Sequence, residues 1–170
     1  MVFKPSSKDE LQEAVNLWTS KRYSAINRYG EINTWDTSEI TDMSELFKDK
    51  RYFNDNISNW NVSNVTDMSK MFLLADDFNQ PIGDWDTSKV TNMRSMFSSA
   101  YIFNQPIGNW NVSNVTDMGS MFYSAKAFNQ PIGNWDVSNV TNMEEMFVYA
   151  STFDQDIGNW NYSQIVCSYQ

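Results

Sequence analysis

Paired carboxylates are the arrangement in this 170-residue chain that could do acid–base chemistry. Two acidic pairs have their members two residues apart, Asp84 with Asp86 and Asp154 with Asp156. Such a pair can hydrolyse a glycoside when a pocket raises the pKa of one member, but nothing in the pattern indicates a pocket here. The chain has no histidine, and its one thiol, Cys167, has no base partner, which excludes nucleophilic triads and Cys/His metal sites. We therefore expect no enzyme activity, no catalytic residue and no cofactor.

Calcium binding is the stronger chemical alternative, because Asp and Asn side chains are hard oxygen ligands. They recur at intervals of 25 residues in two columns. The first column is Thr34, Asn59, Asp84, Asn109, Asn134 and Asn159, and the second is Asp36, Asn61, Asp86, Asn111, Asp136 and Asn161. Carboxylates are sparse in both, and neither EF-hand nor nonapeptide calcium-loop spacing occurs. We therefore predict no metal site, and interpret the columns as a solvated face whose amides bond between repeats.

The same 25-residue period runs through most of the chain and determines its architecture. Tryptophan recurs at Trp35, Trp60, Trp85, Trp110, Trp135 and Trp160. Isoleucine, methionine and two phenylalanine columns keep the same step, with no insertion that breaks the register. Self-similarity of this kind predicts a repeat protein in which each unit buries its apolar face against its neighbours.

The first part of each unit alternates between apolar and polar residues. In one unit Trp85 and Thr87 fall on one side of the chain, and Asp84, Asp86 and Ser88 on the other. A period of two predicts a short strand with one buried face. Stacking the units would place six such strands in a parallel sheet, with all six tryptophan rings inside.

The later part of each unit changes to a helical period. Met93, Met96, Phe97 and Ala100 fall at i, i+3, i+4 and i+7, which predicts a short helix with one buried face. A turn containing Pro106 and Gly108 would then return the chain. The sequence thus predicts an α/β repeat solenoid of the leucine-rich-repeat type, with a parallel sheet on one face and short helices on the other.

The first 31 residues lack the repeat and predict a helical cap. Ser7 and Glu10 have the spacing of a capping box, and the apolar residues that follow as far as Trp18 mark one helical face. A second helical stretch, near Tyr23, would end at Gly30. We predict a single structural domain, in which residues 1–31 cap a solenoid of about five and a half repeats over residues 32–170.

Two surfaces are candidates for binding. The polar face, on the predicted strands, is uniform, whereas the predicted helix side varies from repeat to repeat. The polar face comprises Asn59, Asn61, Ser63, Asp84, Asp86, Ser88, Asn109, Asn111, Ser113, Asn134, Asp136 and Ser138. The helix side has apolar or aromatic residues at Leu73, Leu74, Tyr101, Ile102, Tyr123 and Tyr149. Varied aromatic contacts favour a protein partner, so we expect a scaffold or interaction module. The alternative is a periodic ligand on the polar face, such as a glycan, an ion lattice or ice.

Charge and the chain ends limit the partners further. The formal net charge is -9, and the residues after Arg51 carry -8 of it, from four basic and twelve acidic side chains. An acidic surface repels phosphate backbones, so nucleic acid is excluded. The sequence has no transmembrane stretch and no secretory leader, which favours the cytoplasm, or the cell surface if a leader has been removed. No cap follows the last repeat, so Ile165, Val166 and Tyr169 would leave a free end suited to self-association.

The unit at residues 103–118, Phe-Asn-Gln-Pro-Ile-Gly-Asn-Trp-Asn-Val-Ser-Asn-Val-Thr-Asp-Met, resembles the BspA-type leucine-rich repeat. That family is also described, through Mycoplasma surface lipoproteins, as a domain of unknown function. The resemblance covers about residues 32–165 and implies a leucine-rich-repeat fold. It also implies surface attachment or binding of host proteins in the bacterial members, the role of an adhesin. The N-terminal pattern looks similar to algal and viral members of the family.

Overall fold

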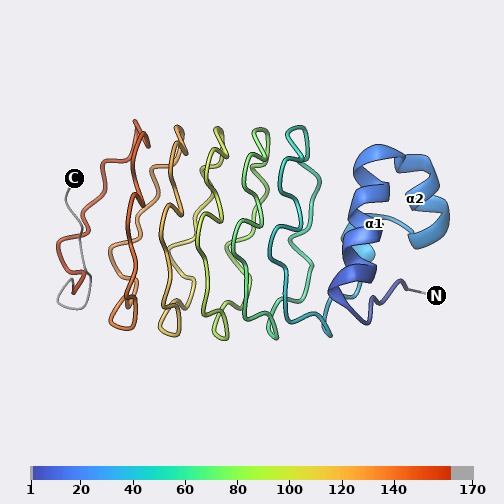
Figure 1. Ribbon diagram of the computed structural model, residues 1–170, viewed down its shortest axis with the longest axis horizontal. Coiled ribbons are helices and arrows are strands. Elements are labelled where there is room, and N and C mark those ends of the chain that lie inside the picture. Colours follow the sequence, from blue (N-terminus) through green and yellow to red (C-terminus); the bar gives the residue numbers. More distant parts are fainter. Residues whose placement is uncertain (1, 162–170) are drawn as a thin grey trace.

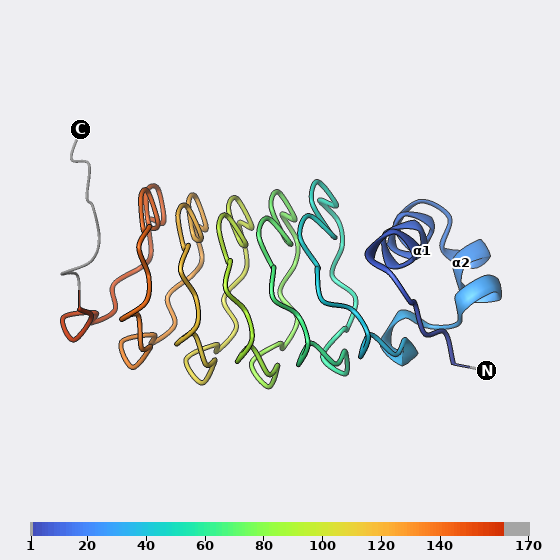
Figure 2. The same ribbon diagram turned by 60° about the horizontal axis from the view of Figure 1, so that its bottom comes forward.

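The computed structural model describes residues 2–161, which form a row of stacked coils with two helices at one end (Figure 1). The helices are α1 (Lys8–Ser20) and α2 (Arg22–Tyr29), and a short 3-10 turn, η1 (Ile32–Thr34), leads into the coils. Figure 2 shows the helices beyond the first coil in a second view, so they lie at the end of the row and not along its side. We number the coils 1 to 5 by the tryptophans that begin them, Trp35, Trp60, Trp85, Trp110 and Trp135.

The two helices form where the sequence predicts them. The Ser7 side chain accepts a hydrogen bond from the Glu10 amide (3.2 Å), and the Glu10 carboxylate accepts one from the Ser6 amide (2.8 Å). The capping box is therefore present, with its return bond displaced by one residue. Helix α1 buries Leu11, Ala14, Val15 and Trp18. Helix α2 ends at Gly30, whose φ of 75° suits a residue without a side chain.

The parallel sheet predicted around the tryptophans is wrong, because residues 2–161 contain isolated β-bridges and no strand. At the start of coil 4 the chain turns, and the Trp110 amide donates to the Ile107 carbonyl (3.1 Å). The Asn111 side chain then accepts from the Ser113 amide (3.1 Å), forming an Asx turn that competes with strand pairing. The alternation itself is real, since Trp110 and Val112 are buried and Asn111 is exposed. Consecutive turns reproduce the inside–outside pattern of a strand.

The helix predicted in each repeat is also wrong, although its apolar positions are correctly assigned to the core. In coil 3 these positions are Met93, Met96, Phe97 and Ala100, all fully buried. The Phe97 amide donates to Met121 of the next coil (2.9 Å), while the Met96 amide donates only three residues back, to Met93 (3.2 Å). Ser95 has a left-handed φ of 54°, which no α-helix contains. The α/β solenoid of the leucine-rich-repeat type is therefore not the fold of this chain.

Backbone hydrogen bonds between coils take the place of a sheet. Alternate amides of coil 3 donate to coil 4, from Ser95 to Gly119 (2.8 Å) and from Ser99 to Tyr123 (2.7 Å). The described parallel bridges are single residue pairs: Asp42 with Asp67, Asp67 with Asn92, Asn92 with Asp117, and Asp117 with Asn142. The coils are thus turns joined at separate points, and buried amides find partners without extended strands.

Two columns of stacked phenylalanine rings form the centre of the core. One column is Phe47, Phe72, Phe97, Phe122 and Phe147, and the other is Phe53, Phe78, Phe103, Phe128 and Phe153. Ring centroids lie 5.5–5.8 Å apart along the first column and 5.9–6.1 Å apart along the second. Within each coil the two rings stack at 3.9–4.1 Å. Each phenylalanine ring therefore packs against the other ring of its own coil and against rings of the neighbouring coils.

The tryptophan rings lie inside, as the sequence predicts. All six repeat tryptophans are only 2–4% exposed. Their indoles also tie successive layers of the stack together, because Trp110 Nε1 donates to the Ile82 carbonyl, 28 residues earlier in the chain (3.0 Å), and Trp60 Nε1 donates to the Ile32 carbonyl (2.9 Å). The residues predicted to leave the C-terminal end open, Ile165, Val166 and Tyr169, lie outside the described residues.

The described coil residues that have a left-handed backbone conformation are not glycines, and Ser95 in coil 3 allows this conformation to be tested. We expect Ser95→Gly to raise the free energy of unfolding by up to about 1 kcal/mol, because a left-handed L-residue costs about 1–2 kcal/mol and glycine loses about 0.4–1 kcal/mol more chain entropy. Ser98, which has no positive φ, is the matched control, and Ser98→Gly should lower stability by about 0.5–1 kcal/mol. Urea denaturation compares them, and equal losses would contradict the assigned backbone.

Candidate binding surfaces

The polar face lies at the surface on turns. Its Asn and Asp residues are exposed, and its serines are half-buried. In coil 2 the Asn61 Oδ1 accepts from both the amide (3.0 Å) and the hydroxyl (2.7 Å) of Ser63. In coil 3 hydrogen bonds from the Ser88 side chain and amide hold the pKa of Asp86 below its ordinary value. The Asn and Asp side chains that form these turns are therefore fixed by bonds within their own coil.

The amide ladder that the sequence suggested for the polar face lies instead on the return turn. The Asn79 Oδ1 accepts from the Asn104 amide (2.9 Å) and from Gln105 Nε2 (3.1 Å) in the next coil. The same bonds recur one coil further, from Asn129 and Gln130 to the Asn104 side chain. The ladder stabilises the stack, because each return turn fixes the next one.

The acidic pairs considered for catalysis lie at the surface. Asp84, Asp86, Asp154 and Asp156 are exposed, and none lines the pocket described below. Within residues 2–161 no group of three or more Asp, Glu, His or Cys side chains is placed to hold a metal ion. In the same range no helix has the length and apolar character needed to cross a membrane.

A second surface lies on turns of coils 3 to 5. We call it the tyrosine edge, and it comprises Tyr101, Ile102, Tyr123, Val148 and Tyr149. Four of these side chains are 37–68% exposed, and Tyr123 is half-buried. The rings of Tyr123 and Tyr149 meet edge to face at 5.4 Å, and the Lys126 ammonium lies 5.2 Å from the centre of the Tyr101 ring. Of the predicted helix-side residues, Leu73 and Leu74 are half-buried and contribute less surface.

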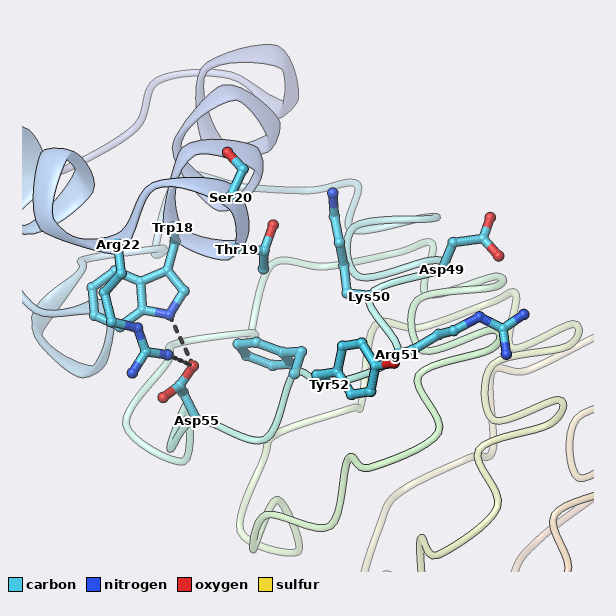
Figure 3. Close-up of a pocket in the computed structure, with 10 residues that line it drawn as sticks. Trp18, Thr19, Ser20, Arg22, Asp49, Lys50, Arg51, Tyr52 and Asp55 are labelled. Atoms are coloured by element: carbon cyan, nitrogen blue, oxygen red, sulfur yellow. Dashed lines mark hydrogen bonds and ion pairs between the residues drawn. The ribbon is translucent and has the colours of Figure 1, made fainter.

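A pocket of about 460 Å³ opens between α1 and coil 1 (Figure 3). The end of α1 contributes Trp18 and Thr19, the start of α2 contributes Arg22, and coil 1 contributes residues 49–53 and Asp55. The Asp55 carboxylate accepts a hydrogen bond from Trp18 Nε1 (2.9 Å) and pairs with the Arg22 guanidinium. These contacts fix the helical end against the coil, so the pocket has a defined wall.

Sequence reasoning missed this pocket, because its residues come from two segments that only the fold brings together. One signal was present. Lys50 stands in a column where the next four coils have Ala75, Ala100, Ala125 and Ala150. A charged side chain in an otherwise apolar column indicates that coil 1 meets something different on its helical side.

The fold is that of a repeat protein. Its stacked coils of turns are closed at one end by helices and present solvent-exposed rows of polar and aromatic side chains. A family model described as "Mycoplasma protein of unknown function, DUF285" matches residues 16–123 and residues 82–169. The chain belongs to this family, and its resemblance to the Mycoplasma repeat domain of unknown function is thereby confirmed. Comparison with curated proteins and with solved structures found no match.

Proposed function

We propose that the chain is a non-catalytic binding module that recognises a protein partner through the tyrosine edge. The observation that carries the proposal is the exposure of large apolar and aromatic side chains on turns of three consecutive coils. Nearly all the other rings of the stack are buried. Tyrosine is enriched at the centres of protein interfaces, because it combines a large apolar ring with a polar group.

The edge is held rigidly, which favours binding. The Ser124 amide donates to the Val148 carbonyl (2.8 Å), and the Ala127 amide donates to the Tyr101 carbonyl (3.1 Å). These bonds join turns of neighbouring coils. The backbone that carries the exposed side chains therefore has little conformational freedom before a partner binds. A surface ordered before binding incurs a smaller entropy cost when a partner docks.

The expected partner is a protein segment with basic and apolar side chains. The chain after Arg51 carries a charge of -8, so a basic partner would be attracted and an acidic one repelled. The repeat motif also resembles the BspA-type repeat, whose bacterial members are implied to bind proteins at cell surfaces. That finer relationship supports a binding role, and it forms part of the proposal.

A displayed peptide library tests the proposal. The whole chain should enrich peptides that combine Arg or Lys with aromatic or aliphatic residues. The triple variant Tyr101→Ser, Ile102→Ser, Tyr149→Ser should bind the enriched peptides at least about tenfold more weakly, which corresponds to about 1.4 kcal/mol.

Tyr23→Ser is the matched control, because Tyr23 lies on α2 and is also well exposed. It should leave the affinity of the selected peptides unchanged. Peptides that bind the triple variant as tightly as the original chain would refute the tyrosine edge as the binding surface, and failure to enrich any basic peptide would refute the partner chemistry.

The second candidate function is the binding of a periodic ligand on the polar face. It is favoured by one observation: the Asx turns at Asn61, Asp86, Asn111 and Asp136 hold the same side-chain geometry in four successive coils. A regular array suits a regular ligand such as a glycan or ice. A glycan array together with an ice-recrystallisation assay distinguishes it from the first candidate. Binding of a glycan or of ice to the polar face would not require the tyrosine edge.

A further inference from the structure

The pocket between α1 and coil 1 contains a cation that is given no partner by residues 2–161. Lys50 is half-buried, and within residues 2–161 its ammonium makes no ion pair or hydrogen bond. By contrast, the two arginines of the pocket are paired, Arg22 with Asp55 and Arg51 with Asp76 (3.0 Å). A half-buried ammonium without a counter-ion is a ready donor to an incoming anion.

Lys50 is also a departure from the repeat. The equivalent residue in each of the next four coils is a buried alanine. Coil 1 therefore has an ammonium where an apolar methyl group would satisfy packing, on the side where α1 leaves a hollow. Packing of the coil does not explain this residue, whereas a ligand in the hollow does.

The pocket is lined by three cations, of which Lys50 is the one that the described residues leave available to an anion. Arg22, Lys50 and Arg51 line it against two carboxylates, Asp49 and Asp55. Because Arg22 pairs with Asp55 and Arg51 pairs with Asp76, the lining charges that remain are Lys50 and Asp49, which balance in number. Asp55 is neutralised by Arg22, so Asp49 is the carboxylate that opposes an anion. Figure 3 shows Asp49 at the far side of Lys50 from Arg22.

The apolar part of the pocket sets the size and shape of the ligand. Tyr52 lines it and is 88% exposed, so its ring is available for stacking. Phe53 lies beside it in the wall. A volume of about 460 Å³ falls in the range of small-molecule sites and accommodates a phenyl group with a carboxylate.

We infer that this pocket binds a carboxylate attached to an aromatic group, with Lys50 as the anion donor and Tyr52 as the stacking surface. A peptide C-terminus ending in an aromatic residue and a free aromatic acid present the same chemistry. The inference is independent of the tyrosine edge, because the two sites share no residue.

Titration of the whole chain, followed by NMR of the backbone amides, tests the inference. The probes are the peptide Gly-Ser-Gly-Phe, its C-terminal amide, and phenylpropionate. We expect saturable shifts at Thr19, Lys50 and Tyr52, and about fivefold tighter binding of the acid than of its amide. A peptide source predicts that Gly-Ser-Gly-Phe binds more tightly than phenylpropionate, and a metabolite source predicts the reverse.

Three variants identify the residue responsible. Lys50→Met keeps the length of the side chain and should remove the preference for the acid. Asp49→Asn removes the opposing charge and should strengthen binding of the acid. Lys21→Met is the matched control, since Lys21 is an exposed lysine outside the pocket, and it should leave binding unchanged. Equal affinity for acid and amide, equal losses in the two lysine variants, or no saturable shift at about 10 mM probe would each overturn the inference.

Discussion

Phe97→Ala is expected to lower the free energy of unfolding by about 3–5 kcal/mol, the loss typical of a large aromatic residue removed from a core. The Phe97 ring is fully buried. It stacks on Phe103 at 3.9 Å within its own coil, and on Phe72 and Phe122 in the two adjacent coils at 5.6 and 5.8 Å. The Trp110 ring also stacks on the Phe97 ring, at 6.2 Å. Alanine therefore leaves a cavity bounded by four rings, none of which can move without losing its other contacts.

The damage should extend beyond coil 3, because each coil is stabilised mainly by its neighbours. Urea denaturation measures the total loss, and amide hydrogen exchange should show faster exchange in coils 2 and 4 as well. Tyr23→Ala is the control, since this exposed ring should cost no more than about 0.5 kcal/mol. If the two variants were equally stable, the stacked phenylalanines would not be the centre of the core.

The repeat and its core could be predicted from the sequence, because burial depends on side-chain type and spacing. The column of Met96 and the column of Phe97 are buried as their period requires. The backbone conformation could not be predicted in the same way, because the period does not report which carbonyl an amide uses. Residues i, i+3, i+4 and i+7 can share one face of a helix. Here the same residues share the buried side of a non-helical coil, in which every second amide donates to the next coil.

Part of the turn structure was nevertheless visible in the residue types. Asn111 with Ser113, and Asp86 with Ser88, have the spacing of Asx turns, which compete with strands. Giving that signal more weight than the alternation would have predicted turns. The left-handed residues offered no such signal, since Ser95 and Ser99 are neither Gly nor Asn.

The two candidate sites differ in the same way, because one could be predicted from the sequence and the other could not. The exposed aromatic residues of the tyrosine edge were found because variation between repeats is a property of the sequence. The pocket was not, because it depends on the packing of α1 onto coil 1. Gln12 illustrates this packing: its Nε2 donates to the Leu46 carbonyl (3.0 Å), where another coil would otherwise supply an amide. No local pattern in the sequence of α1 indicates that contact.

The second large effect is expected at a glycine column. A Cβ atom built on Gly108 would lie 2.4 Å from the Pro131 carbonyl oxygen in the next coil, and the same contact at Gly83 would be 2.3 Å from Pro106. Real Cβ atoms do not approach a backbone oxygen so closely, so Gly108→Ala must push coils 3 and 4 apart locally. We expect a loss of about 1–3 kcal/mol, the usual cost of overpacking.

Two positions in the same column bound the size of this effect. Ser58 occupies the equivalent place in coil 1, so this column of the stack can accommodate a Cβ, and Gly108→Ala should weaken the fold without abolishing it. At Gly158 a Cβ would meet only the Asp156 side chain, at 3.1 Å. Gly158→Ala should therefore change stability by no more than about 0.5 kcal/mol, or raise it slightly by reducing the entropy of the unfolded chain. Thermal and urea unfolding of the two alanine variants measure the difference, and a Gly108→Ala protein as stable as Gly158→Ala would show that the approach of the Pro131 carbonyl does not constrain the stack.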